Sequence, residues 1–522
     1  MRVILDNLKV SVSHIDDDII NMAKKILNEK KIEYENIEIY RKSLDARREN
    51  NIHYSCSVIF DTKVDEEWIN LNPDFRKYEP INIESVISAK KKAKRVVVVG
   101  TGPCGLFSAY LLAKSGLSPI VFERGADVDT RTKIVEDFWK NNKLNPNTNV
   151  QFGEGGAGTF SDGKLTTRIG DPLQRVVLET FVKFGAPEDI LYKAKPHIGT
   201  DKLKSVVKNM RKEIESLGGT VKFNSTVTNV ITENDKLKGV VVNNQEEYPC
   251  DALVLAIGHS SRDTYSMLKE MGIKCEAKAF AAGVRIEHTQ EFINKMQYGK
   301  EYNNPLLPPA DYRLTYNGEE RSCYSFCMCP GGTVVNASSE ENMLVVNGMS
   351  EYKRDGENAN SALVVTVKPS DFDSDDALAG VEFQRKYEGL AYNVAKGKAP
   401  VQLARDFAEN KISVGFNGVN PTFTGDFTFA DLRECLPKFI CDTLKDGLLN
   451  FEKRIKGYTY GGAVLTGVET RTSAPLRILR DENFESVSLK GLYPAGEGAG
   501  YAGGIMSAAV DGIKIALKIC QI

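Results

Sequence analysis

The sequence contains no long apolar run and no concentration of charge of one sign. No stretch approaches the ~18 apolar residues of a membrane-spanning helix, and the chain reaches Asp6 before any apolar core of signal-peptide length. We therefore expect a cytoplasmic protein with no membrane segment. The 68 Lys and Arg residues are balanced by 70 Asp and Glu residues, so we do not expect nucleic acid as the main ligand.

Histidine and closely paired cysteines are also scarce. The 522 residues include five histidines and ten cysteines, and no two cysteines have Cys-x-x-Cys spacing. This pattern excludes a disulfide-stapled scaffold and supplies no ligand set for structural zinc, so we expect a reducing compartment and no metal site. The remaining composition is that of an ordinary globular protein, and the length predicts about three domains.

The amino-terminal part is predicted to be a separate unit followed by a linker. Apolar residues recur at helical spacing behind Ser13, and residues 52–60 alternate between apolar and polar side chains with one lapse, as a strand does. These patterns predict a β-α-β-β domain over residues 1–65. Residues 72–95 contain two prolines and the basic run Lys90–Arg95, which we interpret as a solvated linker because no aromatic residues are interleaved to stack nucleic-acid bases.

A nucleotide-binding segment follows this linker. The β-branched run 96–99 leads directly into Gly100-Thr101-Gly102-Pro103-Cys104-Gly105 and then into a helical pattern. The first glycine permits a tight turn, the second lets a pyrophosphate approach, and the third lets the helix pack on the strand. A second strand ends in Glu123, 18 residues after Gly105, where a carboxylate can accept hydrogen bonds from the adenosine ribose.

A second glycine-rich string, Gly153-Glu154-Gly155-Gly156-Ala157-Gly158, also fits the dinucleotide pattern. It has no apolar strand before it and no helical period after it. We therefore interpret it as a flexible loop that lies against a bound cofactor through Gly156, Gly158 and Thr159, and not as a second dinucleotide site.

Two distant segments add to this pattern. Residues 222–258 read as successive strands that end at Gly258. Near the C-terminus, residues 491–500 contain Glu497 and precede an amphipathic helix that begins near Gly504.

With these segments the chain resembles the glutathione-reductase-type FAD-binding fold, in which all three contact one FAD. The resemblance implies that Glu497, in place of the family's usual Asp, bonds the ribityl hydroxyls. A helix N-terminus near Gly504 would stabilise negative charge on the reduced flavin. The residues expected to bind FAD are Gly100, Gly102, Pro103, Cys104, Gly105, Glu123, Arg124, Gly156, Gly158, Thr159, Gly258, Gly496, Glu497, Gly504 and Ile505.

More narrowly, the chain resembles a bacterial family of FAD-dependent dehydrogenases with an N-terminal β-α-β-β domain. Residues 153–165, 326–332 and 466–472 carry this likeness. It implies an α/β fold with a Rossmann-like FAD-binding domain, an inserted α+β substrate domain and a small N-terminal α+β domain. The expected boundaries are 1–90 for the N-terminal domain and linker, 91–270 and 461–522 for the FAD-binding domain, and 271–460 for the substrate domain.

Few side chains are candidates for the chemistry. His259 directly follows the strand end at Gly258, where a strand meets the cofactor crevice, and such a histidine can titrate near neutral pH or simply bond local backbone. Arg471 lies shortly before the flavin motif and is a candidate for the active site. Glu469 lies beside it, and Arg262 and Arg285 flank the return to the sheet. An acidic substrate could use these arginine cations, and ordinary ion pairs are the competing interpretation.

Cys327 and Cys329 belong to the densest cysteine cluster of the chain. A cysteine pair can exchange electrons with a flavin when a thiolate comes close to it. On an extended strand, alternate residues stand about 6.5 to 7 Å apart, which is at the edge of disulfide reach. Packed thiols without a redox role are the competing interpretation.

Three classes of function fit these observations. The leading one is an FAD-dependent oxidoreductase, a dehydrogenase or reductase, that moves hydride between flavin and a small-molecule substrate. NAD(P)H would then be a transient co-substrate, because no second strand-glycine-helix unit would hold it. The alternatives are a flavin-dependent RNA-modification enzyme with the N-terminal domain as RNA platform, and a flavoprotein whose FAD is structural. The sequence does not set the oligomeric state.

Overall fold

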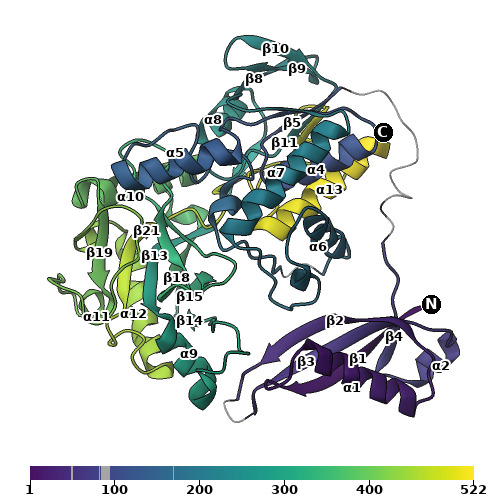
Figure 1. Cartoon of the computed structure of the whole chain (residues 1–522). Coiled ribbons are helices and arrows are strands. Elements are labelled where there is room, and N and C mark those ends of the chain that lie inside the picture. Colours follow the sequence, from purple (N-terminus) through teal and green to yellow (C-terminus); the bar gives the residue numbers. More distant parts are fainter. Residues whose placement is uncertain (49–50, 82, 84–94, 168–169, 522) are drawn as a thin grey trace.

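A computed structural model describes residues 1–48, 51–81, 83, 95–167 and 170–521 (Figure 1). The chain forms a small N-terminal domain, an α/β part around a parallel sheet, and a part built on a seven-stranded sheet. This architecture confirms the predicted fold class. Among the described residues, no helix combines the length and apolarity needed to cross a bilayer.

The N-terminal domain is a four-stranded antiparallel sheet of order β2-β3-β1-β4. Its elements are β1 (Arg2–Ser11), α1 (Asp16–Glu29), β2 (Glu35–Asp45), β3 (His53–Asp61), α2 (Glu66–Leu71) and β4 (Phe75–Lys77). The segment predicted as a linker therefore contains a fourth strand, because the buried Phe75 ring packs edge-on against Phe60 and Trp68. Of the basic run 90–95, all but Arg95 lies outside the described residues.

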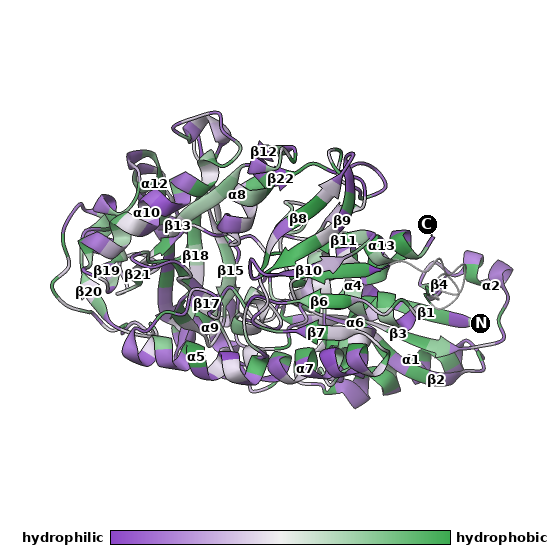
Figure 2. Ribbon diagram, turned by 90° about the horizontal axis from the view of Figure 1, so that it is seen from above, coloured by the Kyte–Doolittle hydropathy of each residue, from purple (hydrophilic) through white to green (hydrophobic). Residues whose placement is uncertain are grey.

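The α/β part contains a parallel sheet of order β23-β11-β5-β6-β7. Its elements are β5 (Val96–Val99), α4 (Pro103–Lys114), β6 (Ile120–Phe122), α5 (Val128–Asn141), α6 (Leu173–Lys183), α7 (Thr200–Ser216), β7 (Thr220–Lys222), β11 (Ala252–Leu255), β23 (Leu492–Pro494) and α13 (Ile505–Gln521), with short 3-10 turns η2 (Ala157–Phe160) and η3 (Glu188–Leu191). Hydrophilic and hydrophobic stretches alternate along α5 and α7 (Figure 2), as expected for helices with one face on a core.

An antiparallel sheet of order β10-β9-β8 and one helix accompany the parallel sheet. They are β8 (Val227–Glu233), β9 (Lys236–Val242), β10 (Glu246–Pro249) and α8 (Arg262–Glu270). Together with β7 and β11 these strands confirm the run of strands predicted over residues 222–258.

The seven-stranded sheet has the order β14-β15-β18-β13-β21-β19-β20. Its elements are β13 (Phe280–Thr289), β14 (Thr315–Asn317), β15 (Ser322–Cys329), β18 (Asn358–Val367), β19 (Ala399–Leu403), β20 (Phe427–Phe429) and β21 (Val464–Glu469), with helices α9 (Gln290–Tyr298), α10 (Ala379–Val394), α11 (Ala404–Ala408) and α12 (Lys438–Arg454), 3-10 turns η4 (Gly299–Glu301), η5 (Pro369–Asp371) and η6 (Leu432–Glu434), and the two-stranded pairs β16 (Thr333–Asn336) with β17 (Val346–Met349) and β12 (Cys275–Ala277) with β22 (Leu476–Ile478). The strand β21 pairs with β13, so this sheet extends past the boundary expected at residue 460.

The N-terminal domain docks on the rest of the chain through the edge strand β2 (Figure 1). The Lys42 amide donates to the carbonyl of Tyr192 at 2.7 Å, and the Ala194 amide donates to the carbonyl of Lys42 at 3.0 Å. A third contact joins the Tyr54 hydroxyl to the carbonyl of Leu306 at 3.0 Å. The N-terminal domain is therefore part of one continuous structure with the other two parts.

Helices α4 and α13 pack unusually closely, although one begins near residue 100 and the other near residue 500. A Cβ atom at Gly512 would lie 2.2 Å from the carbonyl oxygen of Cys104, and the Ser108 hydroxyl donates to the Gly512 carbonyl at 3.0 Å. The absence of a side chain at Gly512 therefore allows the two helices to lie in backbone contact.

We predict that Gly512→Ala destabilises the protein by roughly 1–3 kcal/mol, because the new methyl group overlaps the backbone of α4. Thermal unfolding monitored by circular dichroism checks this. The matched control is Gly389→Ala in α10, where a Cβ would meet Met343 at an ordinary 3.5 Å and the higher helix propensity of alanine should stabilise slightly. Equal melting temperatures for the two variants would contradict the close-packing argument.

Candidate functional site

A large cavity lies where the three parts of the chain meet. Its volume is about 2290 Å³, and its wall contains residues of the parallel-strand ends, the seven-stranded sheet and the N-terminal domain. Pockets for single drug-sized ligands usually measure ~300–1,000 Å³. The cavity therefore has room for a dinucleotide together with a second small molecule.

The glycine turn after β5 lies at one end of this cavity. Gly100 has φ +96°, and a Cβ there would stand 2.3 Å from the carbonyl oxygen of Ala256, while a Cβ at Gly105 would stand 1.9 Å from the carbonyl oxygen of Gly100. These two glycines serve the close packing of the turn and the helix. At Gly102 a Cβ would meet only Gly156, at 3.9 Å, so this position faces open space.

A second helix N-terminus faces the same cavity. Helix α13 begins at Ile505, and Gly503 and Gly504 precede it in the cavity wall. A Cβ at either glycine, or at Gly258 after β11, would meet no atom of the described residues within 4 Å. Because the first amides of a helix have no intrahelical acceptor, the N-termini of α4 and α13 together offer N–H groups and partial positive charge to an anionic ligand.

Glu497 lies in the cavity wall as an unpartnered carboxylate. Its Oε1 stands 4.0 Å from Nε2 of His259, and among the described residues it has no hydrogen-bond partner. Burial raises the pKa of Glu497 to about 7, opposed by the positive charge of Lys278. A ligand that donates hydroxyl groups would satisfy this carboxylate, as the resemblance implies for the ribityl chain.

Glu123, in contrast, is already fully hydrogen-bonded. Its carboxylate accepts from the amide and hydroxyl of Thr101 at 2.9 and 2.7 Å, and from the amides of Gly125 and Gly153, each at 3.0 Å. A carboxylate has about four lone-pair sites, so a ribose hydroxyl would be a fifth donor. In this arrangement Glu123 fastens the glycine turn to two neighbouring loops.

Arg124 follows Glu123 in the cavity wall. Its guanidinium lies 4.4 Å from the centre of the Phe152 ring and donates to Asp263 at 2.9 Å. It therefore presents a flat cationic surface, already held in place, beside the glycine turn.

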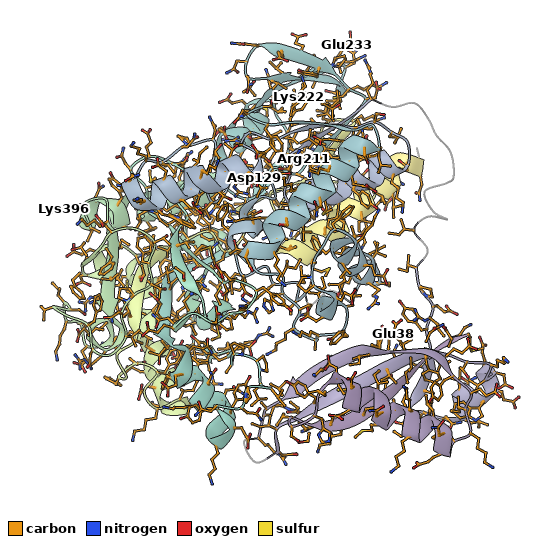
Figure 3. All side chains as sticks on the ribbon, in the orientation of Figure 1. Glu38, Asp129, Arg211, Lys222, Glu233 and Lys396 are labelled. Carbon is orange, nitrogen blue, oxygen red and sulfur yellow. The ribbon has the colours of Figure 1, made fainter. Side chains whose placement is uncertain are left out.

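The glycine-rich string 153–158 is held firmly, which corrects the prediction of a flexible loop. The buried guanidinium of Arg131 in α5 donates to the backbone carbonyls of Asn149, Val150, Gly153, Glu154 and Gly156 at 2.7–3.2 Å. The buried Glu154 side chain accepts from Arg211 of α7, labelled in Figure 3, at 2.7 Å. The sequence prediction failed because these partners come from distant positions in the chain.

Most, but not all, of the predicted FAD-binding residues line the cavity. Gly156 and Gly158 do so, beside Gly102 and Ile505. Three of the predicted FAD-binding residues lie behind the wall and act through packing: Gly105, Thr159 and Gly496. Of these, Thr159 is buried and donates to the carbonyl of Glu154, and the Gly496 amide donates to Asp511 at 2.7 Å.

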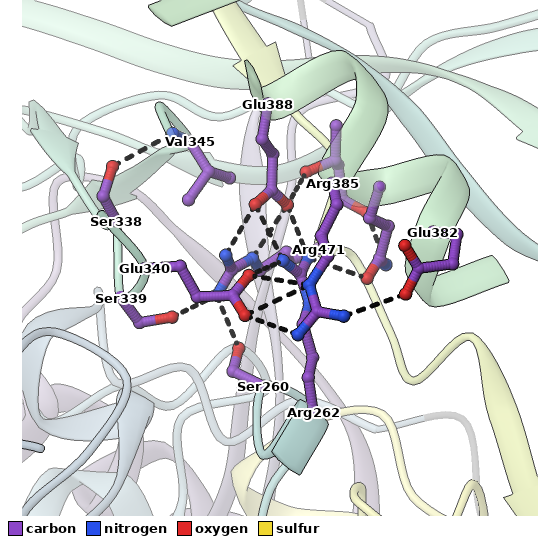
Figure 4. A network of polar contacts seen from close by, with 12 residues as sticks. Ser260, Arg262, Ser338, Ser339, Glu340, Val345, Glu382, Arg385, Glu388 and Arg471 are labelled. Atoms are coloured by element: carbon purple, nitrogen blue, oxygen red, sulfur yellow. Dashed lines mark hydrogen bonds and ion pairs between the residues drawn. The ribbon is translucent and has the colours of Figure 1, made fainter. Parts of the chain in front are cut away.

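Arg471 belongs to a buried network of ion pairs (Figure 4). Its guanidinium donates to both oxygens of Glu388 at 2.9 and 2.6 Å, to Ser339 at 2.6 Å and to Ser260 at 3.1 Å. Arg262 donates to the same Glu388 at 2.7 and 3.1 Å and also pairs with Glu340. The two arginines hold the pKa of Glu388 far below its usual range, and the guanidinium of Arg471 is engaged by protein side chains.

His259 lines the cavity beside this network. Burial, together with the positive charges of Arg471 and Arg262, lowers its pKa to about 4. His259 is therefore neutral at physiological pH, which disfavours the first of the two alternatives that the sequence left open, titration near neutrality. Its Nδ1 lies 3.0 Å from the Ser260 hydroxyl, so the network also orients the ring.

Cys327 and Cys329 lie at a β-bulge and not on an extended strand. Pairing of β15 with β18 shifts between Phe326 and Cys329, and Cys327 has φ +44°. Cys327 lines the cavity, whereas Cys329 is fully buried behind it. The strand spacing assumed from the sequence therefore does not apply to this pair.

Several cavity residues carried no signal in the sequence. Lys164 and Arg354 both pair with the buried Asp162, and Lys278 faces Glu497. Lys42 of the N-terminal domain also lines the cavity. These positions are brought together only by tertiary packing, and no local motif marks them.

Models of known families match three stretches of the chain. Residues 98–146 match the NAD(P)-binding Rossmann-like domain, residues 177–287 match the pyridine nucleotide-disulphide oxidoreductase family, and residues 279–472 match the FAD-dependent protein, C-terminal domain-like family. An uncharacterized protein of Clostridium beijerinckii is 52% identical over 531 residues, covering 100% of this chain and 99% of that protein.

Among solved structures, the chain is similar to CtdE in complex with FAD, at 12% identity and TM-score 0.33 over 82% of this chain and 84% of that chain. It is also similar to the flavin-dependent brominase Bmp2, at 14% identity and TM-score 0.37 over 82% of this chain and 79% of that chain. For glycine oxidase of Bacillus cereus the identity is 11% and the TM-score 0.36, over 82% of this chain and 98% of that chain. Likenesses this distant carry no argument about the reaction.

The fold and the matched families define an FAD-dependent oxidoreductase. Within this class, the chain belongs to the same family as the Clostridium beijerinckii protein. The open glycines, the two helix N-termini and the unpartnered Glu497 fit an FAD molecule extended along one wall of the cavity.

We predict that Gly102→Val abolishes FAD retention while the protein still folds, because the side chain would enter the cavity and not the protein core. The flavin-to-protein ratio after purification and the circular dichroism spectrum check this. Gly415→Val is the matched control, since a Cβ there also meets no described atom within 4 Å but lies outside the cavity wall. A Gly102→Val protein with full flavin content would place the pyrophosphate elsewhere.

We predict that Glu497→Gln stabilises the FAD-stripped protein at pH 8 by up to about 3 kcal/mol and leaves it unchanged near pH 4. The folded-state pKa of about 7 lies above that of the unfolded chain, so wild-type stability falls as pH rises from about 4.5 to 7. Melting temperatures across this range, with the exposed Glu341→Gln as control, measure the difference. A pH-independent difference would remove Glu497 as the titrating group.

Proposed function

We propose that this protein transfers hydride between FAD, held in the glutathione-reductase-type manner, and a small substrate that enters the cavity from the side of the seven-stranded sheet. Bound FAD supplies the two-electron redox centre. The observation that carries the proposal is the cavity itself, because its 2290 Å³ exceeds what one ligand usually fills and one end is built of glycines and helix N-termini.

The chain's own residues would bind and orient the reactants. The first amides of α13 favour a developing negative charge at the cavity wall, and Glu497 accepts hydrogen bonds from ligand hydroxyls. His259, being neutral, would act as a hydrogen-bond donor or acceptor and not as a cation.

An acidic substrate is supported by two cations in the cavity wall. Arg262, Arg285 and Arg471 are each paired with buried carboxylates. In contrast, Arg313 and Lys353 line the cavity and form no ion pair or hydrogen bond with the described residues. Such cations can bind a carboxylate or phosphate group.

The position of the N-terminal domain also favours a small substrate. Lys42 and Tyr54 of this domain line the cavity, and the edge of β2 is used in docking. This arrangement supports a role as part of the cavity wall in preference to an RNA platform.

We predict that anaerobic titration of the purified holoprotein with NADH or NADPH bleaches the flavin, and that neither nicotinamide co-purifies, because the sequence contains one strand-glycine-helix unit. Flavin absorbance measured against added reductant tests the first part, and mass spectrometry of the denatured supernatant tests the second. A flavin that stays oxidised with both, but is reduced by dithionite, would exclude the nicotinamides as donors.

A further inference from the structure

The bulge in β15 brings two cysteines together at the cavity wall. Phe326 pairs with Ala362 and Cys329 pairs with Asn360, so Cys327 and Met328 stand opposite the single residue Ser361. A bulge of this kind bends the strand and re-aims its side chains. As a result the extended-strand spacing does not apply to Cys327 and Cys329, and their thiols are close enough for the ionisation of one to affect the other.

The two sulfur atoms have different surroundings. Cys327 is partly exposed to the cavity, whereas Cys329 is 0% exposed and also donates to the carbonyl of Cys327 at 3.4 Å. A reactant in the cavity can therefore reach the first sulfur only, and the second lies directly behind it.

Two cations lie against this pair. Nη2 of Arg285 stands 3.7 Å and Nζ of Lys164 stands 4.0 Å from the sulfur of Cys329. Lys164 shares Asp162 with Arg354, and Arg285 pairs with Glu469. These three cations and two carboxylates leave one positive charge, which a thiolate would balance.

The electrostatics separate this pair from the other cysteines. The neighbouring thiol and the charges of Lys164 and Arg285 lower the pKa of Cys327 to about 6, while that of Cys329 rises because a second thiolate would lie against the first. Burial instead raises the pKa of Cys323, on the same strand, well above its usual range. All ten cysteines are free thiols.

We propose that Cys327 and Cys329 form a redox-active dithiol that reduces small disulfide substrates in the cavity. The Cys327 thiolate attacks one substrate sulfur, which forms a mixed disulfide and releases one substrate thiolate. The Cys329 thiol gives its proton to that thiolate and attacks Cys327, which forms the internal disulfide and releases the second thiolate. Two electrons pass from the dithiol to the substrate.

Reduction of the internal disulfide back to the dithiol rests on the proposed function, because it needs a flavin that accepts hydride. Reduced flavin, when bound, would supply the two electrons and the one proton that convert the internal disulfide back to one thiol and one thiolate. The second cysteine suits a disulfide substrate, because its thiol resolves the mixed disulfide.

The test uses the FAD-bound protein in glutathione redox buffers, followed by alkylation and mass spectrometry. In wild type we expect loss of two free thiols and a Cys327–Cys329 disulfide. In Cys329→Ser, glutathione should remain attached to Cys327, whereas Cys327→Ser should form neither product. Cys323→Ser, the control on the same strand, should behave as wild type.

A second measurement reports the charge environment. The rate of iodoacetamide alkylation at Cys327 should rise with an apparent pKa near 6, and Lys164→Met should raise that apparent pKa by about 1 or more with unchanged flavin content. If Lys164 acted only through packing, its replacement would leave the pH dependence of Cys327 alkylation unchanged.

The proposal is overturned if no internal disulfide forms in any glutathione buffer and Cys329→Ser traps no glutathione. Both readouts are masses, so they do not depend on hydride transfer. Flavin bleaching by NAD(P)H without a disulfide would reject the dithiol alone, and disulfide formation with a flavin that stays oxidised would reject the proposed reductant alone.

Discussion

The shape of the cavity depends on the pairing of one buried carboxylate with two arginines. Glu388 of α10 is 0% exposed and is bonded by Arg262, at the start of α8, and by Arg471, beyond the end of β21. Loss of one partner from such a site leaves an uncompensated buried charge, which costs about 3–5 kcal/mol. Because the three side chains come from different parts of the chain, their pairing fixes the parallel sheet and the seven-stranded sheet relative to each other.

The same network divides the cavity into regions of different electrostatics. Burial and the positive charges of this network keep His259 neutral, whereas burial raises the pKa of Glu497, 4.0 Å away, to about 7. At the bulge in β15, cations exceed carboxylates by one charge. A ligand that spans the cavity would meet hydroxyl-accepting groups at one end and cationic groups at the other.

The sequence predicted those features that local chemistry controls. The turn at Gly100–Gly105, the strands between 222 and 258 and the helix after Gly504 follow from glycine placement and periodicity. The rigid loop at 153–158 did not follow, because Arg131 reaches it through tertiary packing. The roles of the site residues depend on groups far apart in the chain.

The predictions that failed have the same physical origin. The neutral state of His259 depends on its burial and on the arginines at positions 262 and 471, and the Cys327 bulge depends on the register of β18. Strand β4 lies in the segment predicted as a linker. It forms because Phe75 packs against aromatic residues elsewhere in the domain, and a count of prolines and apolar residues does not reveal such contacts. Pattern analysis therefore located the cofactor end of the cavity better than its far wall.

The docking of β2 on residues 192–194 also bears on solubility. An uncovered edge strand presents unpaired amides and carbonyls to any other chain, and it is a template for aggregation. Here the backbone bonds of Lys42 to Tyr192 and Ala194 cover part of that edge. The contact that places the N-terminal domain in the cavity wall thus also protects this edge from pairing with another chain.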